Sequence, residues 1–402
     1  MSKFDTESRE KTWCRGFRSA AVAAGIKKNK GKDLGLIFSE VPANAAGVFT
    51  RNRVQAAPVL VDKQHLQSGK CQALIVNSGN ANCCTGEQGM RDALSMCRFA
   101  ADALHISEQL VCAASTGVIG QPMPIGKVEA AMPELAKALR PEGLEDFAHA
   151  IMTTDLVPKI VSVEGQIQGR SFRMTGAAKG SGMIRPDMAT MLCFVCTDID
   201  MPSRDLQNAL RIATDLSFNR ITVDGDTSTN DMILLMANGL SGAKAETAQD
   251  REIFQSLLNE VLLGLARMVV KDGEGATKLV EIAVKGAASD ADARKVADTI
   301  AHSNLVKTAL FGEDANWGRI LAAAGRSGVA LDPYKTDIFF NEVQMAKNGM
   351  TCGDAAEAEA TKVLKTPEYV ITVDLNSGAG KASVLTCDFS IDYVKINADY
   401  RS

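Results

Sequence analysis

The alternation of strand-like and helix-like segments constrains the fold of this chain most. Short apolar runs bounded by Gly, Asn or Ser are typical of strands. Three such runs are "LGLIFSEV" (34–41), "AAGVFT" (45–50) and "QALIVNSG" (72–79). Apolar residues repeat near a helical period of 3.6 at 88–105, 203–217 and 248–270. Near the C-terminus, "EYVITVDLN" and "KASVLTCDFS" flank "SGAG" and predict a hairpin. The pattern predicts a mixed α and β fold.

Length and charge narrow the class of protein. The 402 residues suffice for two domains or for one large layered domain. With 44 Lys and Arg against 48 Asp and Glu, the chain is too balanced to suggest a nucleic-acid or membrane-surface partner. The first residues contain no apolar core of a signal peptide, and no uncharged apolar run approaches the roughly 20 residues that cross a bilayer. We expect a soluble, cytoplasmic protein with small-molecule partners.

The cysteines and histidines suggest no familiar catalytic site. Cys193 and Cys196 have the C-x-x-C spacing of redox and zinc sites, but no second pair accompanies them, and "TMLCFVCTD" is typical of a buried strand. The four histidines stand outside any G-x-S-x-G or H-E-x-x-H pattern. We therefore expect no metal site and a nucleophile that works without histidine.

A glycine-rich segment in the middle of the chain, "TGAAKGSGMIRPD" (175–187), leads toward Thr190. An internal threonine is a poor nucleophile. A cut before Thr190 would create an α-amino group with a pKa near 8, within reach of its own Oγ. An ordered loop could present the Ala189 carbonyl to Thr190 Oγ for an N→O acyl shift. The residues alone leave a second interpretation open, in which Thr190 is an ordinary β-branched strand residue.

The acidic stretch "DGDTSTND" (224–231) imitates the start of a calcium loop. An EF-hand is excluded because Thr229 and Leu235 stand where its glycine and final glutamate belong. We expect a network of Asx, Ser and Thr turns there.

The segment "KGSGMIRPDMATMLCFVCTD" resembles the ornithine acetyltransferase family, also called bifunctional glutamate N-acetyltransferase, of cyclic arginine biosynthesis. The likeness continues in the family's order along the whole chain. Its further motifs are "AGIK" (24–27), "AAGVFTRNRVQAAPV" (45–59), "NSGNANCCTG" (77–86), "STGVIGQPMP" (115–124), "MTTD" (152–155), "TVDGDTSTND" (222–231), "DGEGATK" (272–278), "NWGRI" (316–320) and "INADYRS" (396–402).

This resemblance implies self-cleavage between Ala189 and Thr190, which gives an α chain of residues 1–189 and a β chain of residues 190–402. Thr190 would take the acetyl group from N-acetylornithine, release ornithine and pass the acetyl group to glutamate, forming N-acetylglutamate in a ping-pong cycle. The resemblance implies no metal or organic cofactor, an α₂β₂ heterotetramer, and a four-layer α-β-β-α sandwich like that of N-terminal nucleophile hydrolases but with its own connectivity. Use of acetyl-CoA as a co-substrate stays open.

The resemblance also assigns the site residues. The oxyanion hole falls on Thr116, through its hydroxyl, and Gly117, through its backbone N–H. The substrate contacts are Thr153, Lys179, Thr190, Glu274, Asn397 and Ser402. Thr153 is not firmly separated from Thr154, and Ser402 stands where the family usually has threonine. From the residues alone, an ordinary turn at 116–117, solvated charges and a frayed C-terminus stay open.

Two other functions stay open beside this expectation. The first is a self-cleaving amidohydrolase or aminopeptidase on a related scaffold, in which water resolves the acyl-enzyme. The second is an uncleaved amino-acid-binding protein with a decayed site. Acetyl transfer to glutamate, measured against acetate release, separates the first, and an intact chain would favour the second.

Overall fold

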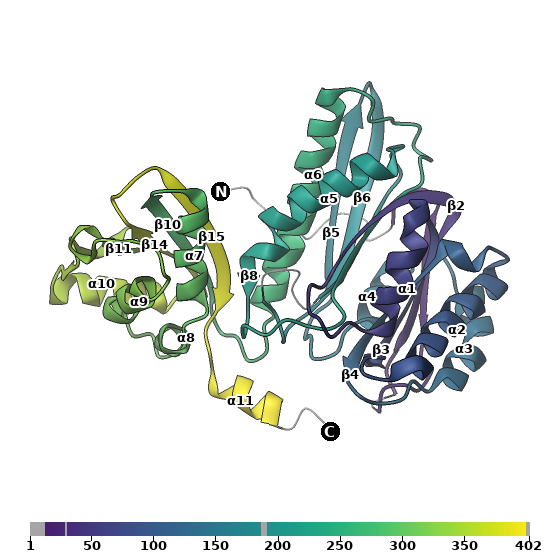
Figure 1. The fold of residues 1–402 in the computed structure, drawn as a ribbon, viewed down its shortest axis with the longest axis horizontal. Helices are drawn as coiled ribbons and strands as arrows, with labels where there is room; N and C mark the ends of the chain where they lie inside the picture. Colours follow the sequence, from purple (N-terminus) through teal and green to yellow (C-terminus); the bar gives the residue numbers. More distant parts are fainter. Residues whose placement is uncertain (1–12, 29, 186–190, 399–402) are drawn as a thin grey trace. The chain divides into compact units, whose positions relative to one another are not determined.

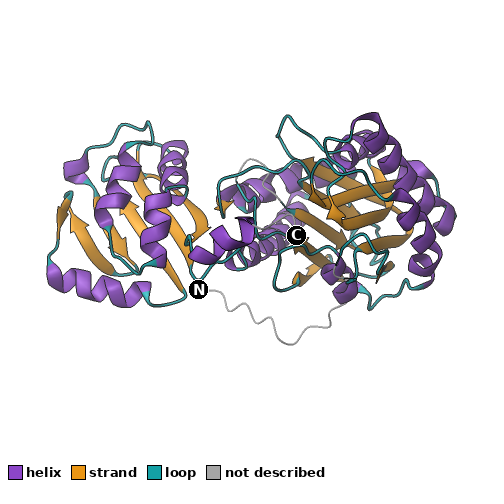
Figure 2. Ribbon diagram, turned by 90° about the horizontal axis from the view of Figure 1, so that it is seen from below, coloured by secondary structure: helices purple, strands orange, loops and turns teal. Residues whose placement is uncertain are grey.

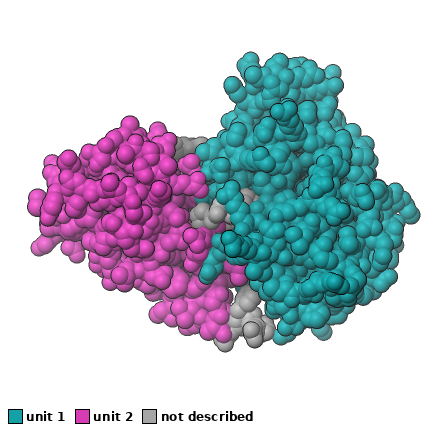
Figure 3. All heavy atoms as spheres, in the orientation of Figure 1, with its two compact units in different colours: residues 1–180, 187–219, 226–269 teal, residues 181–186, 220–225, 270–402 magenta. Residues whose placement is uncertain are grey.

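The structure, a computed structural model, describes residues 13–28, 30–185 and 191–398. Within these residues the chain forms two compact units, coloured separately in Figure 3. Unit 1 takes its residues from 1–180, 187–219 and 226–269, and unit 2 from 181–186, 220–225 and 270–402. Each unit is thus assembled from several segments. The boundaries of these units differ from those of the expected cleavage products, residues 1–189 and 190–402. The cleavage itself stays a prediction.

Unit 1 contains one sheet in the order β4-β3-β2-β9-β7-β6-β5, with β1 beside β2. Figure 1 labels β2 to β6 of this sheet. Its strands are β1 (Phe17–Val22), β2 (Leu34–Phe49), β3 (Lys70–Asn80), β4 (Val111–Val118), β5 (Lys159–Ile167), β6 (Arg170–Lys179), β7 (Leu192–Thr197) and β9 (Met232–Ala237). Its helices are α1 (Ala57–His65), α2 (Gly86–Leu104), α3 (Ile125–Lys137), α4 (Leu144–Ala150), α5 (Ser203–Leu216) and most of α6 (Ala248–Lys271). The predicted helices at 88–105, 203–217 and 248–270 are therefore confirmed.

Strand β2 is long, and its two halves belong to two different halves of this sheet. Its first half pairs with β1 and β3, its second half pairs with β9, and its register with β3 shifts between Phe38 and Ala43. Such an irregularity bends a strand and increases its twist. The apolar runs at 34–41 and 45–50, expected as two separate strands, form one bent strand instead.

The bend in β2 gives unit 1 four layers. One core cluster contains Ile37 and Leu74 from the β1–β4 half together with Phe194 and Leu234 from the β5–β9 half. A second cluster joins the outer face of β2, β3 and β4 to α1, α2 and α3, which Figure 1 shows on that side. Helix α6 covers the other half, where the glycine at 176 leaves room for side chains of α6. The predicted α-β-β-α sandwich is confirmed, and unit 1 forms it.

Helix α6 is long and apolar enough to cross a membrane by length and composition alone. Its side chains at Leu258, Val261 and Leu265 are fully buried in the protein core. A core helix of a globular unit has these same properties, and we describe α6 as one.

Unit 2 contains a second sheet in the order β13-β12-β11-β14-β10-β15-β8. Its strands are β8 (Ile221–Thr222), β10 (Leu279–Ala287), β11 (Asp337–Phe340), β12 (Val343–Lys347), β13 (Met350–Thr351), β14 (Glu368–Asp374) and β15 (Gly380–Cys387). Its helices are α7 (Asp290–Ala301), α8 (Asn304–Phe311), α9 (Trp317–Gly325), α10 (Asp354–Leu364) and α11 (Ile391–Ala398). Helices α7 to α10 pack with one face of this sheet through an apolar cluster, and Figure 2 separates helices from strands by colour.

The predicted C-terminal hairpin is wrong. Strands β14 and β15 form as expected, but β10 lies between them, parallel to β14 and antiparallel to β15. The connection must cross the end of β10, where a Cβ on Gly378 would lie 2.4 Å from the Ala287 carbonyl oxygen. The glycines that suggested a tight turn thus permit a close crossing over a third strand.

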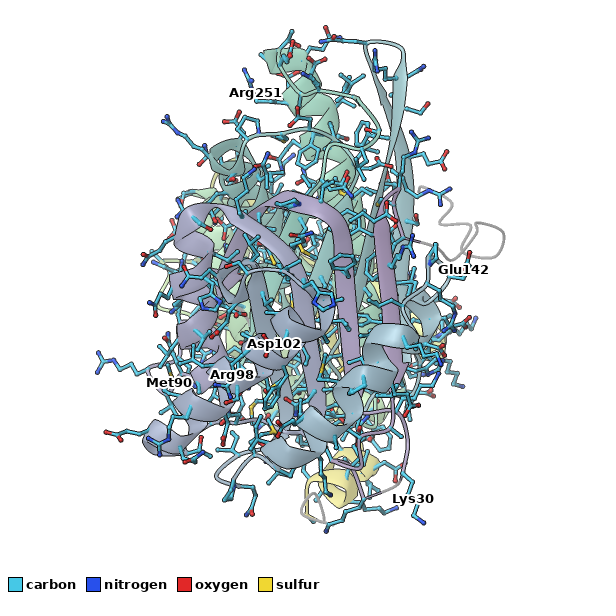
Figure 4. All side chains as sticks on the ribbon, turned by 90° about the vertical axis from the view of Figure 1, so that its right-hand side faces the viewer. Lys30, Met90, Arg98, Asp102, Glu142 and Arg251 are labelled. Atoms are coloured by element: carbon cyan, nitrogen blue, oxygen red, sulfur yellow. The ribbon has the colours of Figure 1, made fainter. Side chains whose placement is uncertain are left out.

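Charged side chains of both signs cover the outer surface of unit 1. Figure 4 labels five of them, all exposed: Lys30, Arg98, Asp102, Glu142 and Arg251. Opposite charges are interspersed on this side of the unit, in line with the nearly balanced charge of the chain.

Candidate active site

Lys179, the last residue of β6, lies at the centre of a buried polar cluster in unit 1. Its ammonium group donates to Thr153 Oγ1 at 2.8 Å and to Thr116 Oγ1 at 3.4 Å. Thr153 follows α4 and Thr116 lies near the end of β4, so three distant segments meet at one cation. Only 5% of the Lys179 surface is exposed. All three residues were predicted as members of the site, and the structure brings them together.

Asp155 supplies the negative charge of this cluster. Its Oδ1 accepts from Lys159 Nζ at 2.7 Å and from the Gly180 N–H at 2.6 Å, and its Oδ2 lies 3.9 Å from Lys179 Nζ. Burial alone would raise the pKa of Asp155, but the charges of Lys179 and Lys159 outweigh it and hold that pKa well below its usual range. The carboxylate therefore stays ionised and fixes both lysines and the backbone at Gly180.

Thr116 and Gly117 lie near the end of β4, and only glycine fits the second of these positions. Gly117 has a φ of +133°, and a Cβ there would lie 2.4 Å from the carbonyl carbon of Gly79 on β3. The Thr116 hydroxyl accepts from Lys179, which leaves its own O–H able to donate to another group. A hydroxyl and a backbone N–H on adjacent residues are the donor types that stabilise an oxyanion.

The backbone on either side of the expected cut is anchored by carboxylates of one loop. In unit 2, Asp224 accepts the N–H groups of Met183 and Ile184 at 2.6 and 2.9 Å. In unit 1, Asp231 accepts the Met191 N–H at 2.9 Å. The predicted cleavage residues Ala189 and Thr190, and Ser402 at the C-terminus, lie outside the described residues. The strand expected after Thr190 is confirmed as β7.

Two more predicted substrate contacts meet in unit 2. Asn397 Nδ2 donates to Glu274 Oε2 at 2.8 Å, and the Glu274 N–H donates to the Ser181 carbonyl at 2.8 Å. A Cβ on Gly182 would lie 2.4 Å from the Glu274 carboxyl carbon. Glu274 therefore packs against the glycine-rich loop that follows Lys179 in the sequence, and glycine at 182 makes this close approach possible.

The C-x-x-C pair is part of the strand, as expected. Cys193 and Cys196 are fully buried in β7, and residues three apart in a strand point to opposite faces. Burial raises the pKa of both thiols. Neither residue is placed for redox chemistry with the other.

Sequence reasoning missed Asp155 and Asp231. Each is the last residue of a motif that was quoted, "MTTD" and "TVDGDTSTND", but only threonines in the first motif received a role. The expected turn network of 224–231 is confirmed where Asn230 N–H donates to Ser228 Oγ and Thr229 Oγ1 donates to Asn230 Oδ1. An acidic residue that closes a short polar motif beside a predicted strand was the available signal for both carboxylates.

Comparison with known proteins identifies the class and then the family. The ArgJ family model matches residues 18–402. The chain is 53% identical, over 96% of its length and 99% of the relative, to the arginine biosynthesis bifunctional protein ArgJ of Syntrophotalea carbinolica. A crystal structure of that bifunctional protein from Bacillus halodurans is 44% identical, with a TM-score of 0.48 over 50% of this chain and 95% of the other. Ornithine acetyltransferase from Mycobacterium tuberculosis, solved with ornithine, is 39% identical, with a TM-score of 0.42 over 44% of this chain and 96% of the other.

The family match and the relatives together define an acyltransferase of arginine biosynthesis. The chain belongs to the ArgJ family, and the match supports a glutamate N-acetyltransferase of arginine biosynthesis. The self-cleaving aminopeptidase that was left open is not favoured by these matches.

Proposed function

We propose that this chain cuts itself between Ala189 and Thr190 and that Thr190 is then the nucleophile of acetyl transfer. The observation that carries the proposal is the contact of Lys179 with hydroxyls from two other segments, Thr153 and Thr116. The anchors at Met183, Ile184 and Met191 support it further, because they hold the described residues on both sides of the cut. The products are residues 1–189 and 190–402.

The cut begins when Thr190 Oγ attacks the Ala189 carbonyl carbon and the scissile C–N bond breaks. The hydroxyl proton leaves Oγ, and the Thr190 nitrogen gains a proton as it becomes an amine. Water then hydrolyses the resulting ester, leaving a carboxylate on Ala189 and restoring the hydroxyl. The new amine, with a pKa near 8, serves as the base that an internal threonine lacks.

Acetyl transfer uses the same atoms in two half-reactions. Thr190 Oγ gives its proton to the amine and takes the acetyl group of N-acetylornithine, and the departing ornithine amine is protonated. The amine of glutamate then attacks the acetyl ester, forming N-acetylglutamate and restoring the hydroxyl. Because each half-reaction passes through an oxyanion, Thr116 and Gly117 are the proposed donors to it.

The charges of the clusters match the two substrates. Lys179 and the hydroxyl of Thr153 suit a substrate carboxylate, while Glu274 and Asn397 suit an amine or a polar backbone group. Ser402 is proposed to join the substrate contacts from the C-terminus. We further propose an α₂β₂ assembly in the cytoplasm and catalysis by these residues without a resident cofactor.

Removing the Thr116 hydroxyl is expected to lower turnover. Thr116→Val keeps the shape of the side chain, and kcat should fall about 10²–10³-fold with little change in KM because one oxyanion donor is lost. Thr116→Ser retains the donor and serves as the control. Steady-state kinetics on the processed enzymes measure both values, and an unchanged kcat in Thr116→Val would remove Thr116 from the oxyanion hole.

The proposed function is tested with isotope-labelled N-acetylornithine as donor. We expect the label in N-acetylglutamate when glutamate is present and little free acetate. Release of acetate at the same rate with and without glutamate would instead indicate a hydrolase. A parallel reaction with labelled acetyl-CoA determines whether acetyl-CoA is a second donor. Denaturing gels with N-terminal sequencing of the smaller products locate the cut, and a first residue other than Thr190 would contradict the assignment.

A further inference from the structure

Asp231 is held rigidly at the end of its loop. Its backbone carbonyl accepts the Thr50 N–H at 3.0 Å, and the Thr50 hydroxyl donates to the Ser228 carbonyl at 2.6 Å. The Ala56 N–H donates to the Thr229 carbonyl at 3.0 Å. Asp231 itself is 1% exposed and directly precedes β9. Hydrogen bonds to neighbouring segments therefore fix the backbone that carries the Asp231 side chain.

This side chain fixes the first described residue after Thr190. Asp231 Oδ1 accepts the Met191 N–H at 2.9 Å, and the Met191 carbonyl accepts the Met232 N–H at 3.1 Å. From Leu192 onward, β7 continues in parallel pairing with β9. The backbone of Met191 is thus bonded on both sides, and its N–H depends on a side chain and not on a strand partner.

The other oxygen of this carboxyl is buried beside the described residues. Asp231 Oδ2 is buried and makes no hydrogen bond within the part of the chain that the structure describes. Burial raises the pKa of the Asp231 carboxyl well above its usual range, against the lowering effects of the Met191 N–H, the Ser228 and Thr50 side chains and the Lys179 charge. A buried carboxyl is costly when one of its oxygens lacks a hydrogen bond. The backbone group that this side chain binds is the Met191 N–H, next to Thr190.

The Met191 N–H belongs to the same planar peptide unit as the carbonyl of Thr190. An anchor on that N–H restricts the rotation of this unit. Displacing a reacting group by about 1 Å can cost about 10²-fold in rate. The acceptor on Asp231 can therefore affect chemistry at Thr190 without touching the reacting atoms.

We propose that Asp231 is a positioning residue, which orients the Thr190 nucleophile by accepting the Met191 N–H, and that self-cleavage and acetyl transfer both depend on this hydrogen bond. The inference rests on the proposed role of Thr190. This positioning role would give the loop 224–231 a function besides forming its network of turns.

Two variants of Asp231 separate the hydrogen bond from the charge. Asp231→Ala removes the acceptor, and conversion of the precursor into two chains should slow about 10- to 100-fold. In the processed fraction, kcat should fall while KM for N-acetylornithine stays within about twofold, because the substrate contacts are untouched. Asp231→Asn keeps a carbonyl acceptor of the same shape, so both rates should stay within about threefold of the unmutated protein.

Asp62 on α1 provides a matched control. It too is a fully buried carboxyl whose Oδ1 accepts one backbone N–H, that of Ala113 at 2.8 Å, and whose Oδ2 has no partner among the described residues. Asp62→Ala should lower the thermal midpoint much as Asp231→Ala does, but leave processing within about threefold. Thermal melts of all variants are recorded beside the time courses on denaturing gels.

Three outcomes would overturn the inference. These are normal processing in Asp231→Ala, equal slowing in Asp231→Asn and Asp231→Ala, and equal slowing in the Asp62 control. Failure of the proposed function is distinguished by the unmutated chain. If that chain is cut elsewhere or not at all, the role of Thr190 fails; if it is cut before Thr190 and Asp231→Ala behaves like it, only the positioning role fails.

Discussion

Thr190→Ala is expected to yield a folded protein that stays in one piece and transfers no acetyl group. Without Oγ there is no atom to attack the Ala189 carbonyl, and without the cut there is no free amine to act as base. Acetyl transfer should fall by at least about 10⁴-fold, as it does when a covalent nucleophile is removed. A denaturing gel and the labelled transfer assay measure the two losses.

Thr190→Ser is the control for this variant. Serine keeps the hydroxyl and loses only a methyl group, so we expect at least partial cleavage and measurable transfer. Normal two-chain processing in Thr190→Ala would contradict the mechanism, because the cut would then proceed without the proposed nucleophile. Equal inactivity of both variants would indicate that the hydroxyl alone does not suffice and that the site also requires the methyl group.

Asp155→Ala is expected to destabilise unit 1 by about 3–5 kcal/mol, the range observed when one partner of a buried ion pair is removed. Lys159 is fully buried, and in this variant its ammonium group loses the carboxylate at 2.7 Å. Adding Lys159→Met should recover much of the loss, because the uncompensated charge is removed. Denaturant unfolding of the three proteins measures the effect.

Asp146→Ala is the surface comparison for Asp155→Ala. Asp146 pairs with Lys32 and Arg140, but all three side chains are partly exposed. Such pairs contribute about 0–1 kcal/mol. If Asp146→Ala costs as much stability as Asp155→Ala, burial of the Asp155 pair is not what stabilises unit 1.

The free energy of unfolding at acidic pH provides a second test of the ion pair between Asp155 and Lys159. The pKa of Asp155 is lower in the folded protein than the value of about 3.9 expected in the unfolded chain. Its stabilisation is therefore complete above the unfolded value and is lost as the pH falls toward the folded value. Asp155→Ala should show a weaker loss of stability with acid than the unmutated protein.

Local patterns predicted the elements well because their signals lie in neighbouring residues. The apolar run after Thr190 became β7, and the helical periods became α2, α5 and α6 at nearly the expected bounds. The hairpin failed because nothing in "SGAG" reveals that β10 lies between β14 and β15. The two units were not predicted either, since the chain passes between them in short segments without a linker of distinctive composition.

The candidate site, too, was predicted in part: its residues could be named from the sequence, but their contacts could not. Lys179, Thr153 and Thr116 were assigned through a family resemblance, and no spacing in the sequence would have joined them. The contacts of Asp155 and Asp231 depend on which strands are neighbours. Asp155 lies four positions before Lys159, but its bond to the Gly180 N–H requires β5 and β6 to pair. These contacts join segments that are distant in the sequence, so the residues could be predicted from motifs but their partners could not.

The order of strands in unit 1 indicates that the sheet folds before the proposed cleavage takes place. Strands β7 and β9 come after the proposed cut, yet they lie between β2 and β6, which come before it. In unit 2, Met183 of the first proposed product is held by Asp224 of the second, and in unit 1 Met191 is held by Asp231, so these contacts exist only in folded units. Folding must therefore precede cutting, and the cut would act as a checkpoint that only a completed sheet passes. If the chain is cut there, the two peptides would stay interleaved, because separating them would break the β2–β9 and β6–β7 ladders of hydrogen bonds.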